Sequence, residues 1–207
     1  MSDIHLIYKE IRKRIVLLQY EPGQVLREKE LAEEFKTSRT PIREAFIRLE
    51  QDGLVKIFPN LGTIVSEVSF KQLKDVFELR SYLVRLSGRL AAARIASEEL
   101  DRGRELVEKM KVEQDVRERM RLDMEIHDLI NQAARNQELV KTLAGLRDKA
   151  VRIWAFDRSE APSLENIAEE FEEILDALER RDEDESGRLL EQHARRFVDH
   201  IRNLIFG

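Results

Sequence analysis

Apolar residues recur every three or four positions at the start of the chain, which is the spacing of one buried helix face. The positions are Ile4, Ile7, Ile11, Ile15 and Leu18. Pro22 and Gly23 interrupt this pattern and predict a turn. We therefore expect a first helix over residues 4–18, followed by a turn.

Two further helical patterns follow. A short helix is predicted over residues 28–35, and after the polar stretch "KTS" a third apolar stripe begins. Ser38 or Thr40 is expected to cap the third helix by accepting bonds from its free backbone N–H groups. Pro41 fits the first turn of that helix, where its missing N–H costs little. The stripe consists of Ile42, Ala45, Phe46 and Leu49, and the helix is expected to stop near residues 52–53.

A β-hairpin is predicted next, because "LVKIF" and "GTIVSEV" read as short strands joined by the turn-rich "PNLG". Helix, helix–turn–helix and hairpin in this order are the layout of a winged helix-turn-helix domain. In such a domain the second helix of the pair enters the major groove, and the first crosses the DNA backbone. We predict this domain over residues 1–68.

The rest of the chain is helical in pattern, with polar breaks between the segments. The helical patterns run over residues 70–95, 98–112, 116–134, 137–156, 163–181 and 183–205. Residues 69–207 are therefore predicted to form an all-helical bundle. The expected fold class is mainly α, with an N-terminal winged helix-turn-helix followed by a separate all-α helical bundle.

The composition is typical of soluble, helix-rich proteins, with 42% hydrophobic and 37% charged residues among 207. The absence of cysteine excludes disulfides and thiolate zinc sites. No apolar run approaches the roughly 20 residues that span a bilayer. The N-terminal stretch lacks the continuous apolar core of a secretory signal. A cytoplasmic protein without a membrane partner is expected.

The net charge of −5 does not exclude nucleic acid, because the charge is unevenly spread. Residues 1–66 hold 11 Lys/Arg and 10 Asp/Glu, whereas the remainder holds 25 and 31. The local field on a docking face matters for DNA binding, and the sum over the chain does not decide it.

Arginines gather at the start of the third helix. Arg39 and Arg43 lie four residues apart, on the face opposite the apolar stripe. The planar guanidinium fork can bond phosphate or guanine bidentately. Ser38 and Thr40 can add contacts to phosphate, and Lys29 on the preceding helix can reach the flanking backbone. The alternative is that these arginines only form a solvated helix face. The helix-turn-helix context and the following hairpin favour DNA binding instead.

The stretch "PGQVLREKELAEEFKTSRTPIREAFIRLEQDGLV" resembles the winged helix of the GntR family of bacterial transcription regulators. The resemblance implies that Arg39 and Arg43 make the principal base and backbone contacts. It places Asn60 to Gly62 at the wing tip near the minor groove. Supporting positions are Lys29, Ser38 and Thr40. Two half-sites about one helical turn apart require two modules, so we expect a homodimer on a palindromic double-stranded operator.

A candidate metal site lies in the helical part. Asp123 and His127 are spaced i,i+4 and can share a metal on one helical face. His193 is far away in sequence, but facing helices of a bundle can build such sites. The alternative is a hydrogen-bonded pair without metal. His200 lies seven residues beyond His193, about 10 Å along the same helix.

Residues 70–205 resemble the FCD effector domain of one large GntR branch. The markers are "DVFELRSYL", an aspartate and histidine followed by "ARN", "ILDALERRD", and a histidine eleven residues after that aspartate. The resemblance implies a divalent metal, zinc or nickel, held by one aspartate and three histidines. Asp123, His127 and His193 match three of these ligands, whereas Phe171 stands at the fourth and cannot ligate. A three-ligand site completed by water or an effector carboxylate, and a metal-free pocket, both remain open.

The resemblance also implies that Arg80 faces the pocket and pairs with a carboxylate effector, although a structural salt bridge is an alternative. Phe171 and Arg152 are further effector-binding candidates, and Trp154 is a packed aromatic or a ligand platform. The expected function is a DNA-binding transcription regulator, a repressor in the commoner direction, that responds to a small acidic metabolite. The alternatives are a metal-dependent enzyme, for which no placed general acid or base is found, and an effector-independent DNA-binding dimer.

Overall fold

The computed structural model describes residues 4–59, 61–67, 71–157 and 166–206. Contacts divide the chain into two compact units. The first contains residues 1–73 and 147–158, and the second contains residues 74–146 and 159–207. Asn60 and the side chains of Trp154 and His200, which the sequence singled out, lie outside the described part.

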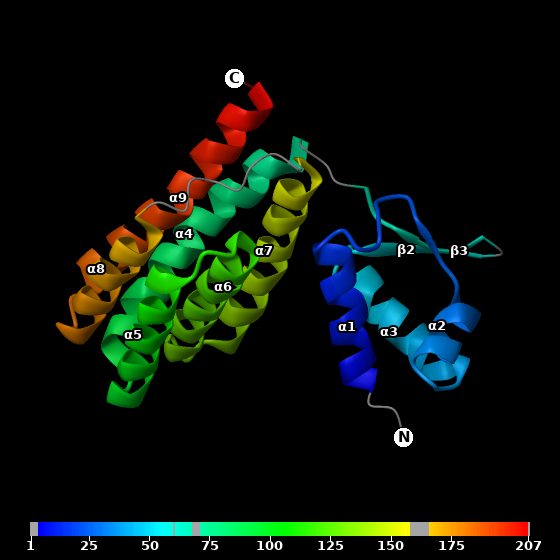
Figure 1. Cartoon of the computed structure of the whole chain (residues 1–207), viewed down its shortest axis with the longest axis horizontal. Helices are drawn as coiled ribbons and strands as arrows, with labels where there is room; N and C mark the ends of the chain where they lie inside the picture. Colours follow the sequence, from blue (N-terminus) through cyan, green and yellow to red (C-terminus); the bar gives the residue numbers. More distant parts are fainter. Residues whose placement is uncertain (1–3, 60, 68–70, 158–165, 207) are drawn as a thin grey trace. The chain divides into compact units, whose positions relative to one another are not determined.

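The first unit contains three helices followed by a hairpin, as predicted (Figure 1). The helices are α1 (Ile4–Val16), α2 (Glu28–Glu34) and α3 (Arg39–Gln51). The strands are β1 (Val25–Leu26), β2 (Val55–Phe58) and β3 (Gly62–Val65), and they form an antiparallel sheet in the order β1-β3-β2. The sequence predicted a turn and no strand before α2, so β1 is a correction. It pairs with β3 through Val25 opposite Ile64 and Leu26 opposite Thr63.

The apolar stripes of α1 and α3 form the core of this unit, because the two helices pack directly together. Nearly all of the predicted stripe residues are buried; they are Ile7, Ile11, Ile15, Ile42, Ala45, Phe46 and Leu49. The first helix ends at Val16, shortly before the predicted residue 18, and Leu18 takes a left-handed conformation with a φ of 52°.

Both ends of α3 follow from local chemistry. Ser38 occupies the N-cap position with extended backbone angles, but its side chain makes no capping bond, so Ser38 does not supply the expected hydroxyl cap. At the other end Gly53 adopts a φ of 73°, a conformation that favours glycine. This lets Leu54 N–H donate to Leu49 C=O and Gly53 N–H donate to Glu50 C=O, both at 2.9 Å. These two bonds are the Schellman motif that ends a helix and turns the chain into β2.

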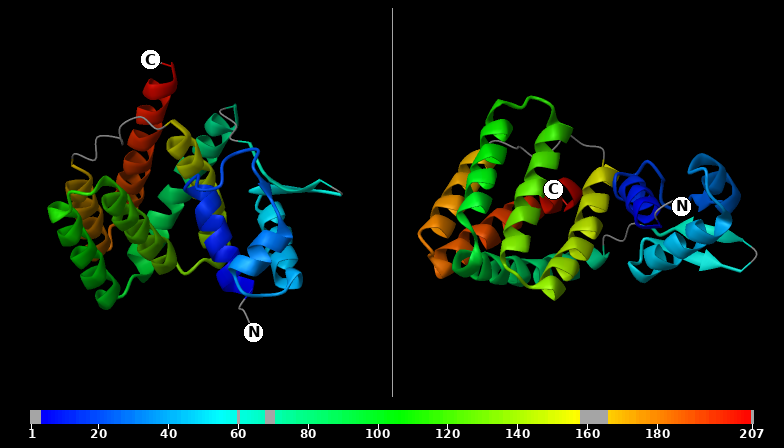
Figure 2. Two further views of the ribbon diagram at one scale, coloured as in Figure 1. Left: turned by 45° about the vertical axis from the view of Figure 1, so that its right-hand side comes forward. Right: turned by 90° about the horizontal axis from the view of Figure 1, so that it is seen from below.

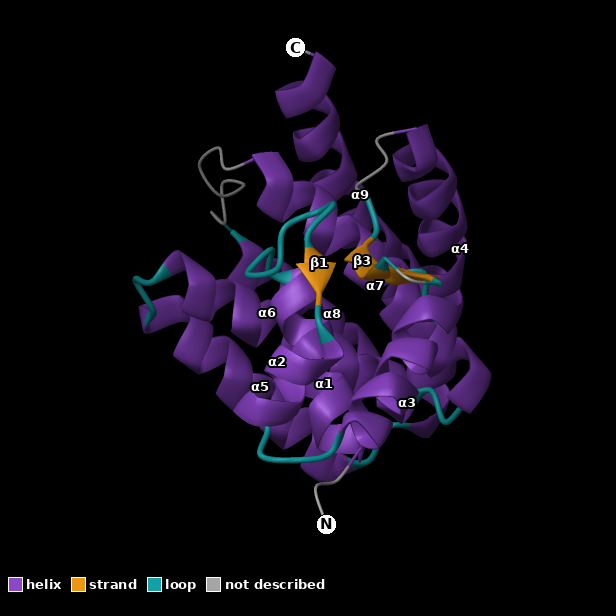
Figure 3. Ribbon diagram, turned by 90° about the vertical axis from the view of Figure 1, so that its right-hand side faces the viewer, coloured by secondary structure: helices purple, strands orange, loops and turns teal. Residues whose placement is uncertain are grey.

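The second unit is entirely helical in its described part (Figures 1 and 2). Its helices are α4 (Lys71–Arg94), α5 (Ser97–Val112), α6 (Val116–Ala133), α7 (Gln137–Asp157), α8 (Ile167–Glu179) and α9 (Glu183–Phe206). Residues 74–146 of this series belong to the second unit, whereas the end of α7 groups with the first. The six predicted helices are therefore confirmed, and the strands of the described residues fall only in the N-terminal part (Figure 3).

Helices α4 and α9 approach each other unusually closely at two glycines. A Cβ atom added to Gly88 would lie 2.7 Å from the carbonyl oxygen of Ser186, and one added to Gly187 would lie 2.8 Å from that of Arg85. Small residues are needed wherever two backbones come this close. In the buried layer between α4 and α6, the hydroxyl of Ser87 donates to Asn131 Oδ1 at 2.7 Å. Within the described residues, no helix is both long and apolar enough to cross a membrane.

Candidate functional site

The N-terminal turns of α3 present the polar groups that the sequence predicted as a DNA-reading surface. Arg39 is the first residue of α3, and Arg43 follows one turn later. Ser38, Thr40 and both arginines are exposed, while the opposite face of α3 is buried in the core. Lys29 is also exposed on α2, and its Nζ lies 3.9 Å from Glu33 Oε1 in an i,i+4 pair.

Arg43 is held by a carboxylate that the sequence analysis did not single out. Its Nε and Nη2 donate to the two carboxylate oxygens of Glu28, each at 2.9 Å. Hydrogen bonding from Arg43 lowers the pKa of Glu28 below its ordinary value, although burial opposes this shift. The Arg43 side chain is still 65% exposed, so the pair lies at the surface. Glu28 therefore fixes the direction of the Arg43 guanidinium before any partner arrives.

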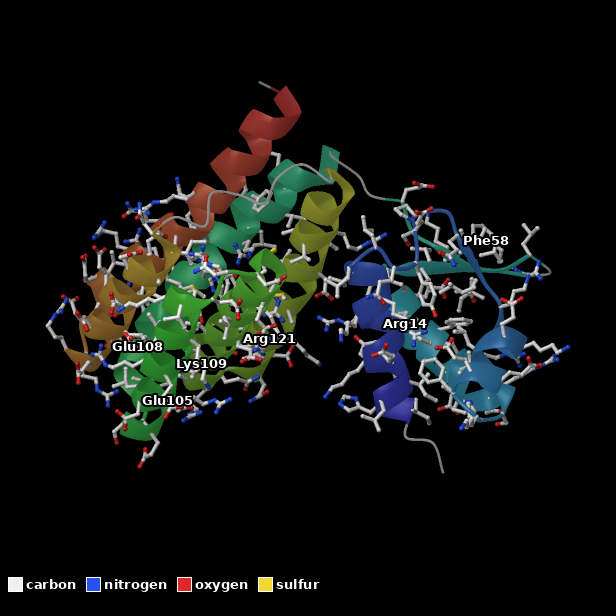
Figure 4. All side chains as sticks on the ribbon, in the orientation of Figure 1. Arg14, Phe58, Glu105, Glu108, Lys109 and Arg121 are labelled. Carbon is white, nitrogen blue, oxygen red and sulfur yellow. The ribbon has the colours of Figure 1, made fainter. Side chains whose placement is uncertain are left out.

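The wing between β2 and β3 carries little positive charge. Lys56 is the single Lys or Arg in residues 55–67. Gly62 begins β3 with a φ of 102°, and Phe58, labelled in Figure 4, and Leu61 are 40% and 70% exposed. Besides the exposed Lys56, this wing offers apolar and backbone groups to a partner.

In the second unit, the structure brings together the three residues predicted as metal ligands. Asp123 and His127 come from α6 and His193 comes from α9. His193 Nε2 lies 3.1 Å from His127 Nε2 and 3.4 Å from Asp123 Oδ1. His127 Nε2 lies 3.9 Å from Asp123 Oδ1. Two nitrogens and one oxygen from two helices thus converge on one point, where both histidines are buried and Asp123 is half-buried.

The other imidazole nitrogen of His193 is already occupied. Its Nδ1 lies 2.8 Å from Glu170 Oε2 on α8, and Arg196 pairs with the second oxygen of Glu170. A carboxylate on Nδ1 fixes the ring orientation and leaves Nε2 for a metal, which is the usual outer shell of a histidine ligand.

The electrostatics of the cluster favour its charged forms. Burial alone would lower the pKa of His193, but hydrogen bonds with Asp123 and Glu170 outweigh burial and raise the pKa. Burial would likewise raise the pKa of Asp123, yet the charges of His127, His193 and Arg80 lower it. The site is thus ready to hold a positive charge against Asp123. A proton on the imidazoles and a divalent cation compete for that place, since metal binding requires neutral imidazole.

The donor spacing fits a small divalent ion. Two ligands that lie about 2.1 Å from one ion at the tetrahedral angle are about 3.4 Å apart. The three observed separations, 3.1, 3.4 and 3.9 Å, bracket that value. Nitrogen and carboxylate oxygen donors suit zinc or nickel. The residues present therefore fit a three-ligand site.

Phe171 and Arg80 border this cluster. Phe171 is fully buried, and its ring centroid lies 5.4 Å from that of His127 and 4.6 Å from that of His193. Arg80 on α4 is buried and acts electrostatically on Asp123. Phe171 therefore fills the space beside both imidazoles.

Arg152, the third effector candidate, has its contacts within the first unit. Its Nη2 donates to the backbone carbonyl of Ser66, and desolvation lowers the pKa of its guanidinium. These contacts belong to the first unit, whereas Arg80 and Phe171 belong to the second. Arg80 and Phe171 thus belong to the unit that holds the metal-ligand cluster, and Arg152 is assigned to the first unit.

Sequence reasoning missed Glu28 and Glu170, and both lie next to residues that it selected. Glu170 immediately precedes Phe171, and Glu28 immediately precedes Lys29. Each carboxylate bonds a side chain on another helix, so its role depends on how two helices pack. In the sequence, each is only an acidic residue next to a candidate site residue. Acidic residues are common at such positions on exposed helices that bind nothing.

Two family models match the chain. The model described as "Bacterial regulatory proteins, gntR family" matches residues 5–65. The model described as "FCD domain" matches residues 75–196.

Similar proteins of known name agree with these matches. The chain is 30% identical to the HTH-type transcriptional repressor RspR of Escherichia coli strain K12, over 96% of this chain and 88% of that protein. It is 31% identical to a probable D-xylose utilization operon transcriptional repressor of Paenarthrobacter nicotinovorans, over 85% of this chain and 78% of that protein. Among solved structures, E. coli McbR/YncC matches with a TM-score of 0.86 at 21% identity, over 98% of this chain and 99% of that one. At this identity the structural likeness supports the fold alone.

Proposed function

Because the chain belongs to the GntR family of bacterial regulatory proteins and carries an FCD domain, we propose that it is a homodimeric transcription regulator whose operator binding is controlled by a small carboxylate effector. Its named relatives are transcription regulators, and two of them are named as repressors. Repression relieved by the effector is therefore the proposed direction.

The DNA-binding half of the proposal rests on α3. Arg39 and Arg43 project from its first turns, on the face that is not used by the core. In this position each guanidinium can reach a guanine edge or a phosphate, and the exposed hydroxyls of Ser38 and Thr40 can reach phosphate oxygens. Gly62 and its neighbours in the wing supply backbone contacts. The two arginines set the sequence preference, and the remaining groups set the register on the duplex.

The sensing half rests on one observation: Asp123, His127 and His193 converge in the second, helical unit, and both histidines are buried there. These three residues would hold a zinc or nickel ion, and Glu170 would orient His193. Such an ion supplies an open position for a carboxylate oxygen. Arg80, beside Asp123, gives that carboxylate a second cationic partner, and Phe171 shapes the apolar side of the pocket.

The regulation is a population shift. An effector controls DNA binding only by its different affinity for two states of the dimer, one competent to span both half-sites and one not. To raise the population of one state from about 1% to about 99%, the effector must bind that state about ten-thousandfold more tightly than the other. A buried charged cluster suits this purpose, because a bound carboxylate changes both the charge and the packing within it.

The test combines metal analysis with operator binding. Operator duplexes are first selected from random double-stranded DNA with the purified protein. Their affinity is then measured between about 50 and about 200 mM salt, where a protein that contacts several phosphates loses several orders of magnitude in affinity. A flat salt dependence would remove the DNA-binding proposal.

Elemental analysis of protein purified without tag or chelator measures divalent metal per subunit. About one equivalent in the wild type, and its loss in His127→Ala and His193→Ala, is the expected result. A screen of carboxylic acids for thermal stabilisation and operator release then follows. Protein without metal, combined with acids that act only through Arg80, would replace the metal-based sensor with a metal-free pocket.

A further inference from the structure

Helix α7 is shared between the two units. Residues 137–146 group with the second unit, and Leu139 and Leu143 there lie in its hydrophobic core. Residues 147–157 group with the first unit, although they lie far along the chain from the hairpin. The two parts form one continuous helix, Gln137–Asp157. The first unit is therefore completed by a segment that the sequence placed in the helical bundle.

A bidentate ion pair attaches α1 to this part of α7. Arg12 Nε and Nη2 donate to the two carboxylate oxygens of Asp148 at 2.6 and 2.7 Å. Asp148 is 6% exposed, and burial raises its pKa more than the charges of Arg12 and Arg147 lower it. A buried ion pair contributes little net stability, but its geometry can fix how two elements meet. The pair therefore acts more on the placement of α1 against α7 than on stability.

The same face of α1 also holds α3. Tyr8 lies one turn before Arg12, and its hydroxyl donates to Asp52 Oδ2 at 2.5 Å. Asp52 is the C-cap residue of α3, the helix that carries the two DNA-binding arginines of the proposed function. Two neighbouring side chains of α1 thus connect α3 to the end of α7.

A second contact joins α7 to the end of the hairpin. Arg152 lies one turn after Asp148, and its Nη2 donates to the backbone carbonyl of Ser66, the residue that follows β3. The N–H of Ser66 donates to the carbonyl oxygen of Leu54 at 2.9 Å, just after α3 ends. We call the Arg12–Asp148 pair and the Arg152–Ser66 bond the α7 clamp. Because the clamp has two points, it restrains the rotation of the winged helix about α7 as well as its position.

We propose that the α7 clamp sets the spacing of the operator half-sites that the protein accepts. The inference rests on the proposed function, because it takes the chain to be a homodimer that reads two half-sites. A winged helix attached through one chain connection alone tolerates a range of spacings, since it is free to rotate about that connection. Two side-chain contacts to a helix that continues into the second unit restrict the range. Arg12, Asp148 and Arg152 are thus positioning residues, which act on DNA through the placement of α3.

The alternative is that the α7 clamp only stabilises the first unit. Loss of the clamp would then weaken binding to every DNA by the same factor, because a damaged winged helix reads one half-site as poorly as two. The spacing role has a different consequence. The affinity for a single half-site is unchanged, and only the advantage of two correctly spaced half-sites falls.

The test compares three duplexes, whose half-sites come from selection of random DNA with the full-length wild type. They are one half-site, the operator, and an operator lengthened between its half-sites by about five base pairs, roughly half a helical turn. Wild type is expected to prefer the operator to the lengthened duplex at least about 100-fold. In Asp148→Asn this preference is expected to fall at least about tenfold, while half-site affinity stays within about twofold of wild type. Fluorescence anisotropy at one salt concentration measures all of these affinities.

Further variants control for charge and for folding. Glu138→Gln removes one carboxylate from an exposed position of α7 in the second unit, and it should keep the wild-type spacing preference. Arg12→Gln breaks the clamp from the other side, at a side chain that is 26% exposed, and should reduce the preference as Asp148→Asn does. The two changes combined should reduce the preference no further than either alone, since both remove the same ion pair.

The outcomes separate the clamp from the regulator. A reduced spacing preference with unchanged half-site affinity, in both clamp variants, supports the inference. Equal losses on all three duplexes, a wild-type preference in both variants, or variants that do not fold would each refute the spacing role and leave the regulator intact. A wild type that binds no duplex selectively, or that binds the half-site as tightly as the operator, overturns the homodimeric regulator itself.

Discussion

Replacing Phe171 by histidine should convert the three-ligand cluster into a four-ligand metal site. The Phe171 ring packs beside His127 and His193, with ring centroids 5.4 and 4.6 Å away. An imidazole at this position comes from α8, next to the donors that α6 and α9 already provide. We expect Phe171→His to bind zinc at least about 100-fold more tightly than wild type, which corresponds to about 2.7 kcal/mol.

The same change should destabilise the metal-free protein. Phe171 is fully buried, so its replacement forfeits part of the roughly 1.5–3 kcal/mol that burial of a large apolar side chain contributes. The new ring also buries polar nitrogens, at a cost of about 1–3 kcal/mol when they are unpaired. Together these effects predict a loss of about 2–5 kcal/mol in the free energy of unfolding without metal. Zinc then restores about 3 kcal/mol more to the variant than to wild type.

Calorimetric melting in chelator and in excess zinc measures both effects, and titration against a competing chelator gives the affinities. Phe171→Leu is the matched control, because it alters packing without adding a ligand. The reasoning fails if the histidine and leucine variants bind zinc equally well. It also fails if Phe171→His is as stable as wild type in chelator, since the ring would then not lie in the packed environment described.

Three further changes test other parts of the structure. Arg39→Ala should weaken operator binding about tenfold or more while leaving the melting temperature unchanged, as measured by fluorescence anisotropy and thermal unfolding. Gly187→Ala should lower the free energy of unfolding by about 1–3 kcal/mol, because its new methyl group meets the Arg85 carbonyl oxygen at 2.8 Å. Gly145→Ala on α7, where nothing lies within 4 Å, should instead raise it by about 0.5–1 kcal/mol. Chemical denaturation measures both. Glu170→Gln should lower zinc affinity about 10- to 100-fold in a chelator competition, because His193 loses its anionic Nδ1 partner, and Glu169→Gln on the same helix should leave the affinity unchanged.

The helices could be predicted from the sequence because each carries its own periodic apolar face. Phe46 and Leu49 identify α3 without knowledge of anything else in the chain. Strand β1 could not be predicted in this way. It has only two residues, and its register is set by Ile64 and Thr63, which lie far along the chain. A strand this short is specified by its partner, and a local pattern does not contain that partner.

Some residues of the candidate metal cluster could likewise be predicted from local spacing, whereas others depend on how the helices pack. Asp123 and His127 share one helix, so their spacing alone placed them together. The match of His193 came from a family resemblance, and the structure supplies its physical basis in the packing of α6 and α9 side chains at 3.1 Å. Glu170 required more still, because its bond to His193 depends on the contact between α8 and α9. Each further side chain requires knowledge of one more helix–helix contact.

The bond between Glu28 and Arg43 bears on how the protein discriminates among DNA sequences. A guanidinium that is free in solution can pair with any phosphate, whereas Arg43 must exchange two hydrogen bonds at 2.9 Å for whatever the DNA offers. An acceptor that takes up both N–H groups, such as the edge of a guanine or a well-aligned phosphate, replaces both bonds, whereas a contact through a single N–H does not. Glu28→Gln should therefore raise affinity for random DNA more than affinity for the operator, and lower the ratio between them about tenfold. Anisotropy titrations of both duplexes at one salt concentration measure this ratio, with Glu33→Gln on the same helix as the control for charge alone. An unchanged ratio in Glu28→Gln would mean that the pair only orders the free surface and takes no part in selecting the operator.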